Sequence, residues 1–451
     1  MEAFMNSCFG TFLCMLFSQY FHKRSWQSFM LLSYGWSLSH QRHTIANYIW
    51  LSGGTKYKHF SQFYCFFSRA FLGVLDQLWA AVLGALDKLL PSQAVIELIV
   101  DDTTRKKSGR KIQGASHYQN RAGSARQEYR TLWGINLVYV IACFDWHKDQ
   151  QSFRLCFPVG LRIYLKKAVA DRLERPYYSR SYLARQIVDQ ISAILADRQF
   201  IIKADGGYST REFLRNLPQN TQVNGRFLVK SRLFAPPAPR KPNQVGRPPV
   251  KGKDLGTPLE WIKDPKGWCD HPEEEGARIK TLTGIWHSLL PGVRIRVVAV
   301  WRPGQLPKDK RSGKKELEAF FFTDPAISPQ QILQHYSQRW SVEIDIRDGY
   351  AYYGLGKDQC RNLDCIYGVN SFRILLAACR TLWFIQYFNK QPLELKKFRP
   401  WYRLKRHPTQ LDIRSAAQEA FFLQGIFPVP RFIQHTNEII SVTQQQGREA
   451  A

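Results

Sequence analysis

The sequence predicts an α/β fold in which a mixed β-sheet is flanked by helices. Short runs rich in β-branched and aromatic residues, at 95–100, 135–144 and 200–202, are typical of strands. Between them, apolar residues recur at helical spacing over 183–194. A helical N-terminal region precedes this pattern, and a β-rich insertion interrupts it before the last helices.

The composition indicates a folded protein with a polyanionic partner. The chain has 451 residues, of which 44% are hydrophobic and 14% aromatic, so it has enough apolar side chains for packed cores and is not intrinsically disordered. Its 64 Lys and Arg residues outnumber 36 Asp and Glu residues, which gives a formal net charge of +28. A surface this basic attracts nucleic acid. At roughly 150 residues per domain, the length predicts about three domains.

The cysteines and the apolar runs predict a reduced, cytoplasmic protein. The nine cysteines are odd in number and include no C-x-x-C pair, which argues against a disulfide framework and a structural zinc site. The nearest approaches to a ligand pair are Cys269 with His271 and Cys360 with Cys365, for which idle thiols are the simpler interpretation. The apolar run at 8–17 is too short to span a membrane and follows no basic residue, so neither an anchor nor a signal peptide is expected.

Residues 1–90 are predicted to form a helical DNA-binding region. Aromatic residues recur at helical spacing over 60–71, where a packed core is the simplest interpretation. The stretch 43–50, followed by Gly53 and Gly54, could be a helix-turn-helix element, although many helical pairs are joined by glycine.

A β-rich insertion with basic loops is predicted within the α/β core. Prolines break the basic stretch 236–253, which includes Gly246-Arg247-Pro248, so no helix can cross it. Strands are expected at 226–232, 293–301 and 320–322, and a second basic loop at 308–315. The predicted organisation after the N-terminal region is a core in two parts, 91–225 and 326–400, separated by the insertion 226–325 and followed by a basic tail, 401–451.

A well-defined helix is predicted to follow the insertion. Ser328 can cap it, Pro329 suits the first helical position, and Gln331 completes a capping box. The helix should run to about Asp348, and another apolar helix should cover roughly 369–388.

Three acidic positions stand out because of where they fall in this pattern. Asp101, with Asp102 beside it, ends the first strand, and Asp205 ends a later strand just before Gly206-Gly207. Glu343 lies inside the predicted helix after the insertion. Ligand sites in open α/β sheets form at strand ends, and a Gly-Gly turn lets a substrate backbone approach closely.

The helix around Glu343 has a polar stripe that allows two interpretations. One face carries, at spacings of three and four residues, Tyr336, Arg339, Glu343 and Arg347. The stripe could be an exposed face with ion pairs between residues four apart. It could equally be a site where Glu343 binds metal while Tyr336 and the arginines hold phosphates.

Three carboxylates that converge in so basic a protein predict a metal site. Clustered like charges repel unless a cation or a proton intervenes, and Mg²⁺ takes oxygen ligands from a few carboxylates. Two such ions roughly 3.5–4 Å apart can activate an attacking oxygen and stabilise a leaving oxygen in phosphoryl transfer. The substrate would then be a phosphodiester, which fits the basic surface.

The order Asp, Asp, Glu on strand, strand and helix resembles the DDE transposases of bacterial insertion sequences, which have a ribonuclease H-like catalytic core. Tyr336-x-x-Arg339-x-x-x-Glu343 is similar to the signature around the catalytic Glu in relatives with a β-rich insertion before it. The segments 101–109 (DDTTRKKSG) and 204–208 (ADGGY) are similar to the blocks around the first two carboxylates. The resemblance covers roughly 90–410.

The resemblance implies a DNA transposase that binds terminal inverted repeats, cleaves DNA and transfers a strand to target DNA, as at least a homodimer on DNA in the bacterial nucleoid. Asp101, Asp205 and Glu343 would hold two Mg²⁺ ions, which Mn²⁺ can replace. Relatives place the first ligand either before an acidic residue and Thr or directly before Thr, so Asp102 is the alternative to Asp101. Strand alternation sends the two side chains to opposite faces, so only one can be the ligand, and we favour Asp101.

The resemblance also implies which residues contact DNA and leaves two other functions open. The expected contacts are Lys106, Lys107, Arg110, Arg247, Tyr336, Arg339, Trp340 and Arg347. Tyr350 departs from the fuller signature, because many relatives carry Lys there. The alternatives are a ribonuclease H-like nuclease or resolvase without strand transfer, and a catalytically silent DNA-binding protein derived from a transposase. The three intact carboxylates argue against the second alternative.

Overall fold

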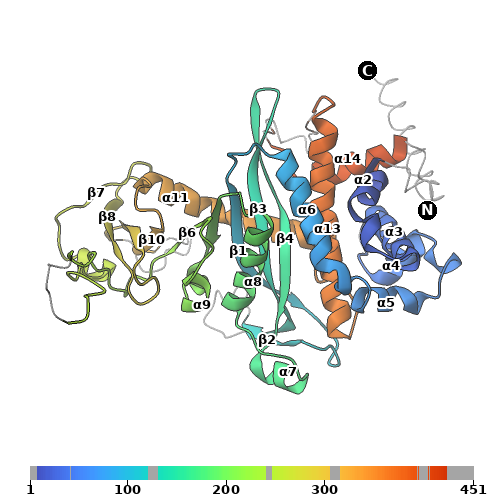
Figure 1. The fold of residues 1–451 in the computed structure, drawn as a ribbon, viewed down its shortest axis with the longest axis horizontal. Helices are drawn as coiled ribbons and strands as arrows, with labels where there is room; N and C mark the ends of the chain where they lie inside the picture. The colour runs from blue at the N-terminus through green and yellow to red at the C-terminus, as the bar shows by residue number, and fades with distance from the viewer. Residues whose placement is uncertain are drawn as a thin grey trace. The chain divides into compact units, whose positions relative to one another are not determined.

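The computed structural model describes residues 8–40, 42–119, 131–239, 246–304, 315–393, 395, 405 and 407–423. The chain divides into two compact units, one formed by 1–78 together with 379–451 and the other by 79–378. Figure 1 shows the order of their helices and strands along the chain.

The first unit is helical. Its helices are α2 (Cys8–Phe17), η1 (Ser18–Tyr20), α3 (Lys23–Leu38), α4 (Ile45–Leu51), η2 (Gly54–Lys56), α5 (Phe60–Ser68), η3 (Leu72–Val74) and α14 (Gln410–Leu423). Gly35 lets α3 approach α4 closely, because a Cβ atom there would lie 2.0 Å from the Tyr48 carbonyl oxygen. The predicted helical character of this region is confirmed, whereas its binding of DNA stays a prediction.

One helical stretch among the described residues is long and apolar enough to cross a membrane. It covers Phe60–Leu89, in which η3 separates α5 from α6 (Leu75–Leu89). Length and composition alone are weak evidence for a span, since the core helix of a soluble protein has the same properties. The expected absence of a membrane anchor therefore stays a prediction.

The second unit is built on one ten-stranded sheet with the order β2-β3-β1-β5-β6-β10-β9-β8-β7, and β4 pairs with β3. The strands are β1 (Ile96–Lys106), β2 (Ser116–Gln119), β3 (Thr131–Lys148), β4 (Gln151–Tyr164), β5 (Phe200–Ala204), β6 (Thr221–Arg226), β7 (Cys269–Asp270), β8 (Arg278–Ile285), β9 (Arg294–Trp301) and β10 (Leu317–Phe322). The β1–β5 and β5–β6 pairs are parallel and the others antiparallel. This mixed sheet confirms the α/β class and is compatible with a ribonuclease H-like fold.

Helices cover both faces of the core sheet. The helices that follow β4 in the chain are α7 (Lys167–Arg172), α8 (Arg180–Ile194), α9 (Arg211–Leu214), α10 (Pro258–Trp261), α11 (Pro329–Ser337), α12 (Ser341–Asp348) and α13 (Leu363–Phe388), and among them α8 and α12 pack on the core sheet. Gly160 of β4 makes room for α8, because a Cβ atom there would lie 2.3 Å from Ile187. On the opposite face, Tyr139 of β3 donates a hydrogen bond to Asp345 of α12. Neighbouring residues of a strand point to opposite faces, so α8 and α12 pack on different sides.

Strand β1 is longer than the sequence indicated. Asp101 does not end it, because antiparallel pairing with β3 continues to Lys106. The parallel pairing with β5 does stop at Val100 and Ala204. The apolar run therefore marks only the part of the strand that is buried between two neighbours.

The β-rich insertion continues the sheet beyond β6. Strands β8, β9 and β10 form an antiparallel meander, as 293–301 and 320–322 predicted. The strand expected at 226–232 is wrong, because β6 covers Thr221–Arg226 and ends where the expected strand would begin. The basic loop expected at 308–315 and the basic tail expected at 401–451 lie mostly outside the described residues.

The helix expected over 328–348 begins as predicted but is not continuous. Ser328 and Gln331 form the capping box of α11. A 3-10 turn, η5 (Gln338–Trp340), then separates α11 from α12, and a π-helical turn, η6 (Gly349–Tyr353), follows. The break therefore separates Tyr336, in α11, from Glu343, in α12.

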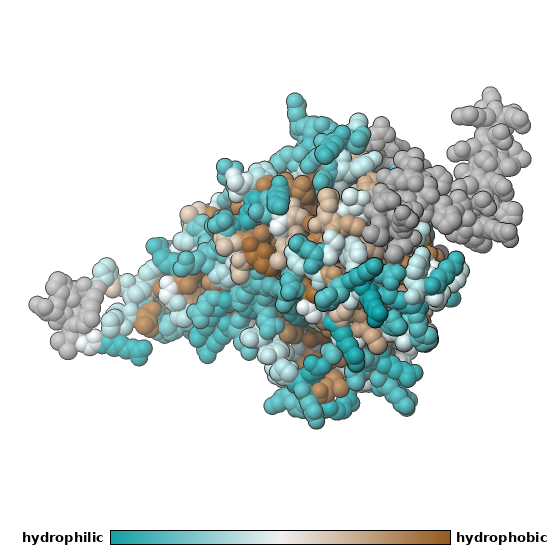
Figure 2. Space-filling model, turned by 45° about the vertical axis from the view of Figure 1, so that its right-hand side comes forward, coloured by the Kyte–Doolittle hydropathy of each residue, from teal (hydrophilic) through white to brown (hydrophobic). Residues whose placement is uncertain are grey.

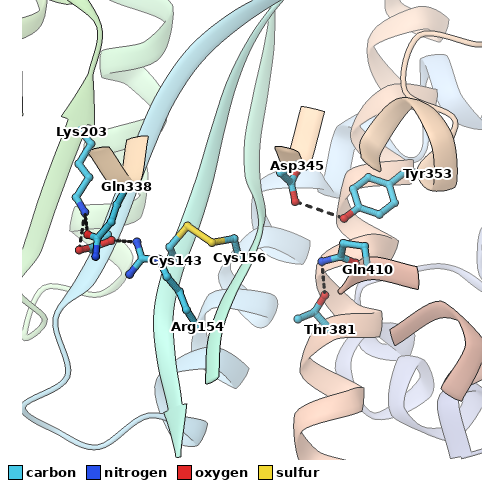
Figure 3. Close-up of a disulfide and its surroundings, with 10 residues drawn as sticks. Cys143, Arg154, Cys156, Lys203, Gln338, Asp345, Tyr353, Thr381 and Gln410 are labelled. Carbon is cyan, nitrogen blue, oxygen red and sulfur yellow. Dashed lines mark hydrogen bonds and ion pairs between the residues drawn. A yellow bond between two sulfur atoms is a disulfide. The ribbon is translucent and has the colours of Figure 1, made fainter. Parts of the chain in front are cut away.

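Two cysteines on neighbouring strands form a disulfide, which the sequence argued against. Antiparallel pairing of β3 with β4 sets Cys143 opposite Cys156, and their Cα atoms lie 4.2 Å apart. Figure 3 shows this bond between the two strands. The prediction that all cysteines are reduced is therefore wrong for this pair, whereas Cys360 and Cys365 are free thiols whose sulfurs lie 3.2 Å apart.

Candidate active site

Asp101 and Asp205 lie at the same level of the sheet. The parallel register pairs Val100 of β1 with Ala204 of β5, and each aspartate follows its paired residue directly. Parallel neighbours in register point to the same face, so the two carboxylates occupy one side of the sheet. The sequence predicted this proximity from the ends of two apolar runs.

Arg339 joins Glu343 to this pair. Its Nη1 atom lies 3.2 Å from Asp101 Oδ2, and its Nη2 atom lies 3.2 Å from Glu343 Oε1. The Arg339 and Asp101 side chains are 16% and 20% exposed, so their contact is largely shielded from water, whereas Glu343 is 38% exposed. The guanidinium therefore brings a carboxylate of the sheet and a carboxylate of α12 to one cation.

Burial and neighbouring charges shift the pKa values of Asp101 and Arg339. Burial, with a smaller contribution from the negative charges of Asp205 and Asp102, raises the pKa of Asp101 to about 6. The hydrogen bond from the Asp102 backbone and the positive charge of Arg339 act in the opposite direction. Burial by itself would lower the pKa of Arg339, but Tyr336 and the three carboxylates raise it above its ordinary value. Positive charge is thus favoured between these side chains.

Asp102 belongs to the other face of β1. Its Oδ2 atom accepts a hydrogen bond of 2.7 Å from Asn136 Nδ2 and lies 3.4 Å from Arg180 Nε of α8. No described contact joins its side chain to Arg339 or Glu343. The geometry therefore supports Asp101 as the carboxylate that meets Glu343.

The Gly-Gly turn after Asp205 fixes the direction of that carboxylate. Asp205 caps the 3-10 turn η4 (Gly206–Tyr208), and its Oδ1 atom accepts a hydrogen bond of 2.8 Å from the Gly207 amide. A Cβ atom on Gly207 would lie 3.0 Å from the same oxygen. The small residue keeps this edge of the carboxylate accessible.

A buried ionic network lies next to the turn that carries Arg339, and the sequence did not predict it. Lys203 Nζ lies 2.6 Å from both Glu97 Oε1 and Gln338 Oε1, and Arg154 also pairs with Glu97. Figure 3 shows Lys203 beside Gln338, with Arg154 close to them. Gln338 immediately precedes Arg339, so the network ties β1 and β5 to the turn that carries Arg339. A signal was present, because charged Glu97 and Lys203 interrupt otherwise apolar strands.

A second buried acid was also missed. Asp345 lies two residues after Glu343, accepts a hydrogen bond of 2.6 Å from Tyr139, and is 3% exposed. Burial raises its pKa to about 7. The sequence contained a signal for this acid. Residues two positions apart on a helix point to nearly opposite sides, so only one of Glu343 and Asp345 can face the sheet.

Several predicted DNA-contacting residues are exposed, whereas Lys107, Tyr336 and Arg339 are engaged within the protein. The exposed ones are Lys106, Arg110, Arg247, Trp340 and Arg347. Lys107 is buried against Asp358 with its Nζ atom 2.8 Å from Oδ2, so its prediction as a DNA contact is wrong. Tyr336 accepts a hydrogen bond from Arg226 and packs on Phe320, which leaves less of it for a phosphate. Figure 2 shows hydrophilic residues over most of the visible surface.

Comparison with known families identifies the family of the chain. Residues 16–287 match the family model of the DDE superfamily endonucleases, which is more than half of the 451 residues. The chain belongs to the DDE superfamily endonucleases. No curated protein matches the chain in a sequence search. Membership of the DDE superfamily endonucleases implies a nuclease or transposase enzyme whose substrate is DNA.

The match to the DDE superfamily endonucleases contains only part of the candidate site. It includes Asp101, Asp102 and Asp205 and ends before Glu343. The association of Glu343 with the two aspartates therefore depends on the contacts of Arg339.

Divalent metals are general in the DDE superfamily endonucleases, and the donor chemistry here suits them. In the parts of the chain that the structure describes, no group of three or more His, Cys, Asp or Glu side chains is arranged to hold a metal ion. Asp101, Asp205 and Glu343 nevertheless offer the oxygen donors that hard cations take. Arg339 already places positive charge between two of them, which is where a cation would be stabilised.

Proposed function

We propose that this DDE superfamily endonuclease is the transposase of an insertion sequence. It binds the terminal inverted repeats, cleaves DNA and transfers the freed strand to target DNA. The observation that carries the proposal is the contact of Arg339 with both Asp101 and Glu343, beside Asp205. Arg339 contacts carboxylates from β1 and α12, and Asp205 directly follows the β5 residue that pairs with the residue before Asp101.

Asp101, Asp205 and Glu343 would hold two Mg²⁺ ions, for which Mn²⁺ can substitute. Bound in this way, the ions would activate the attacking oxygen and stabilise the leaving oxygen of a phosphodiester. Arg339 would orient Asp101 and Glu343 through its two contacts and offer its remaining hydrogens to a phosphate. Asp205 would keep one oxygen on the Gly207 amide and present the other.

Exposed basic residues would bind the phosphate backbone of DNA. The exposed Lys106, Arg110 and Arg347 lie on the elements that carry the carboxylates or directly follow them, and Arg247 lies in the insertion. The net charge of +28 favours phosphate contacts over much of the surface. Two element ends must be brought together, so we propose a homodimer on DNA, acting at the bacterial nucleoid in the cytoplasm.

A nuclease or resolvase without strand transfer is the second candidate. It would use the same carboxylates, so only the fate of the cleaved strand separates the two functions. A catalytically silent DNA-binding protein is less compatible with the site, because the contacts of Arg339 with Asp101 and Glu343 would then be kept without a reaction.

The test is a cleavage and strand-transfer assay on element-end DNA with Mg²⁺, using the full chain. Asp205→Ala and Glu343→Gln should each lower both activities about a hundredfold or more, because transition-state charge would lose a stabilising group. Asp254→Asn is the matched control, since this exposed carboxylate pairs with Arg232 in the insertion. Unchanged strand transfer in either site variant would contradict the assignment, and cleavage without strand transfer in the unaltered chain would favour the nuclease.

A further inference from the structure

We propose that the exposed tyrosines Tyr177, Tyr178 and Tyr182, with the basic residues around them, bind unpaired bases of DNA beside the active site. This inference rests on the proposed function and deepens it, because it assigns a surface for DNA that has lost its base pairing. The surface is formed by the loop before α8 and by the first turn of that helix.

The tyrosines present aromatic faces to solvent. Tyr177, Tyr178 and Tyr182 are 44%, 39% and 40% exposed. The rings of Tyr178 and Tyr182 stack on each other, with centroids 4.8 Å apart and planes inclined by 17°. Stacked, half-exposed rings form a flat platform whose outer face can take a further planar group, and nucleobases are planar.

The charge around the platform suits a phosphate backbone. The segment 162–185 contains seven Lys and Arg residues and only two acidic residues. Lys166, Lys167 and Arg172 are exposed. Aromatic rings next to a basic stretch are the combination by which proteins bind single strands without base pairing, because the rings take the bases and the cations take the phosphates.

The platform is joined to the strand that carries the candidate catalytic carboxylates. Arg180, the first residue of α8, lies 3.4 Å from Asp102 and stacks over the Tyr164 ring at 4.6 Å. Ser179, which caps α8, also hydrogen-bonds to Glu212 of α9, the helix that follows the Asp205 turn. A strand held on the platform would therefore lie on the α8 face of the sheet, beside the part of β1 that carries Asp101 and Asp102 and beside the helix that follows the Asp205 turn.

Unpaired DNA fits this surface better than a duplex does. In a duplex each base face is covered by the next base pair, so an exposed tyrosine platform has nothing on which to stack. A cleavage site opens the stack when its bases are extruded. The platform would then stabilise the extruded or frayed bases while the basic residues hold the strand.

The experiment measures binding without cleavage, by fluorescence anisotropy of labelled oligothymidylate with the full chain in EDTA. The variant Tyr178→Ala/Tyr182→Ala should weaken binding about tenfold, since stacking on aromatic side chains contributes strongly per base. Tyr178→Phe/Tyr182→Phe keeps both rings and should bind as the unaltered chain does. Val95→Ala is the control for loss of an exposed apolar side chain, because Val95 is 43% exposed and lies outside the platform and the predicted DNA-binding regions.

A second probe separates stacking from charge. An oligonucleotide of abasic sites has the phosphates without the bases, so its affinity should be the same for the alanine variant and the unaltered chain. Equal oligothymidylate affinities for these two proteins would overturn the inference, as would absence of binding to the unaltered chain. If the unaltered chain still cleaves and transfers element-end DNA in that case, the proposed function survives, whereas loss of all DNA binding and cleavage would refute both.

Discussion

Asp101 and Asp102 are neighbours in the sequence, yet they belong to two different surroundings. Asp101 faces α12, where Arg339 links it to Glu343 and burial raises its pKa to about 6. Asp102 faces α8, where Asn136 and Arg180 hold it. One residue along a strand turns a side chain to the opposite face, so a motif with two adjacent aspartates places only one at the reaction centre.

The largest effect should come from exchanging each aspartate for its amide. Asp101→Asn should lower metal-dependent DNA cleavage by about a hundredfold to a thousandfold, because charge stabilisation at the reacting phosphate is lost. Asp102→Asn should lower it only about tenfold, because Asp102 acts through Arg180. Initial rates on one element-end substrate measure both. A greater loss in Asp102→Asn would reverse the assignment of the two faces.

The next effect concerns the cations on the two faces. Lys203, on the Asp101 face, is fully buried between Glu97 and Gln338, so Lys203→Met should lower the free energy of unfolding by about 3 kcal/mol. Arg180, on the Asp102 face, has a side chain that is 38% exposed, and Arg180→Met should cost about 1 kcal/mol or less. Denaturant unfolding of both variants gives the comparison. Equal losses of unfolding free energy in the two variants would show that the burial of Lys203 does not make its contacts more stabilising than those of Arg180.

The disulfide gives the Asp101 face a covalent link that can be removed. Cys143 lies opposite Glu97 in the register of β1 with β3, and it closes a loop to Cys156 with a sequence separation of 13. Reduction should lower the free energy of unfolding by about 3 kcal/mol, as expected for a loop of this length. The double variant Cys143→Ala/Cys156→Ala should unfold identically with and without reductant. If reductant does not change the free energy of unfolding of the unaltered chain, the disulfide does not contribute to its stability.

The sequence predicted the parts of this site that depend on chain order. Apolar runs located β1 and β5, and a capping box located the start of α11. Asp101 lies within β1, Asp205 directly follows β5, and Glu343 lies in α12 beyond the η5 break. It did not predict where β1 ends, because the strand continues through polar residues that only β3 pairs.

What the sequence could not predict depends on contacts between distant segments. Lys107 appeared to belong to a basic DNA-contacting block, but Asp358, far along the chain, encloses it. Cys143 and Cys156 are unremarkable by spacing and become partners only through the β3–β4 register. The Glu97–Lys203–Gln338 network needs three segments at once, and no local pattern carries that information.

The smallest effect should appear on acidification, through Glu97. Burial alone would raise its pKa, but contact with His335 and the charges of Lys203 and Arg154 lower it from 4.5 to about 2. A depressed folded-state pKa stabilises the protein above the unfolded value, and this contribution is lost as the pH falls from about 4.5 towards about 2. Between neutral pH and about pH 3, the loss should be about 2 kcal/mol of the free energy of unfolding. Glu97→Gln, which cannot titrate, should show a shallower acid dependence in denaturant unfolding, and an unchanged slope would remove Glu97 as the origin of acid sensitivity on this face.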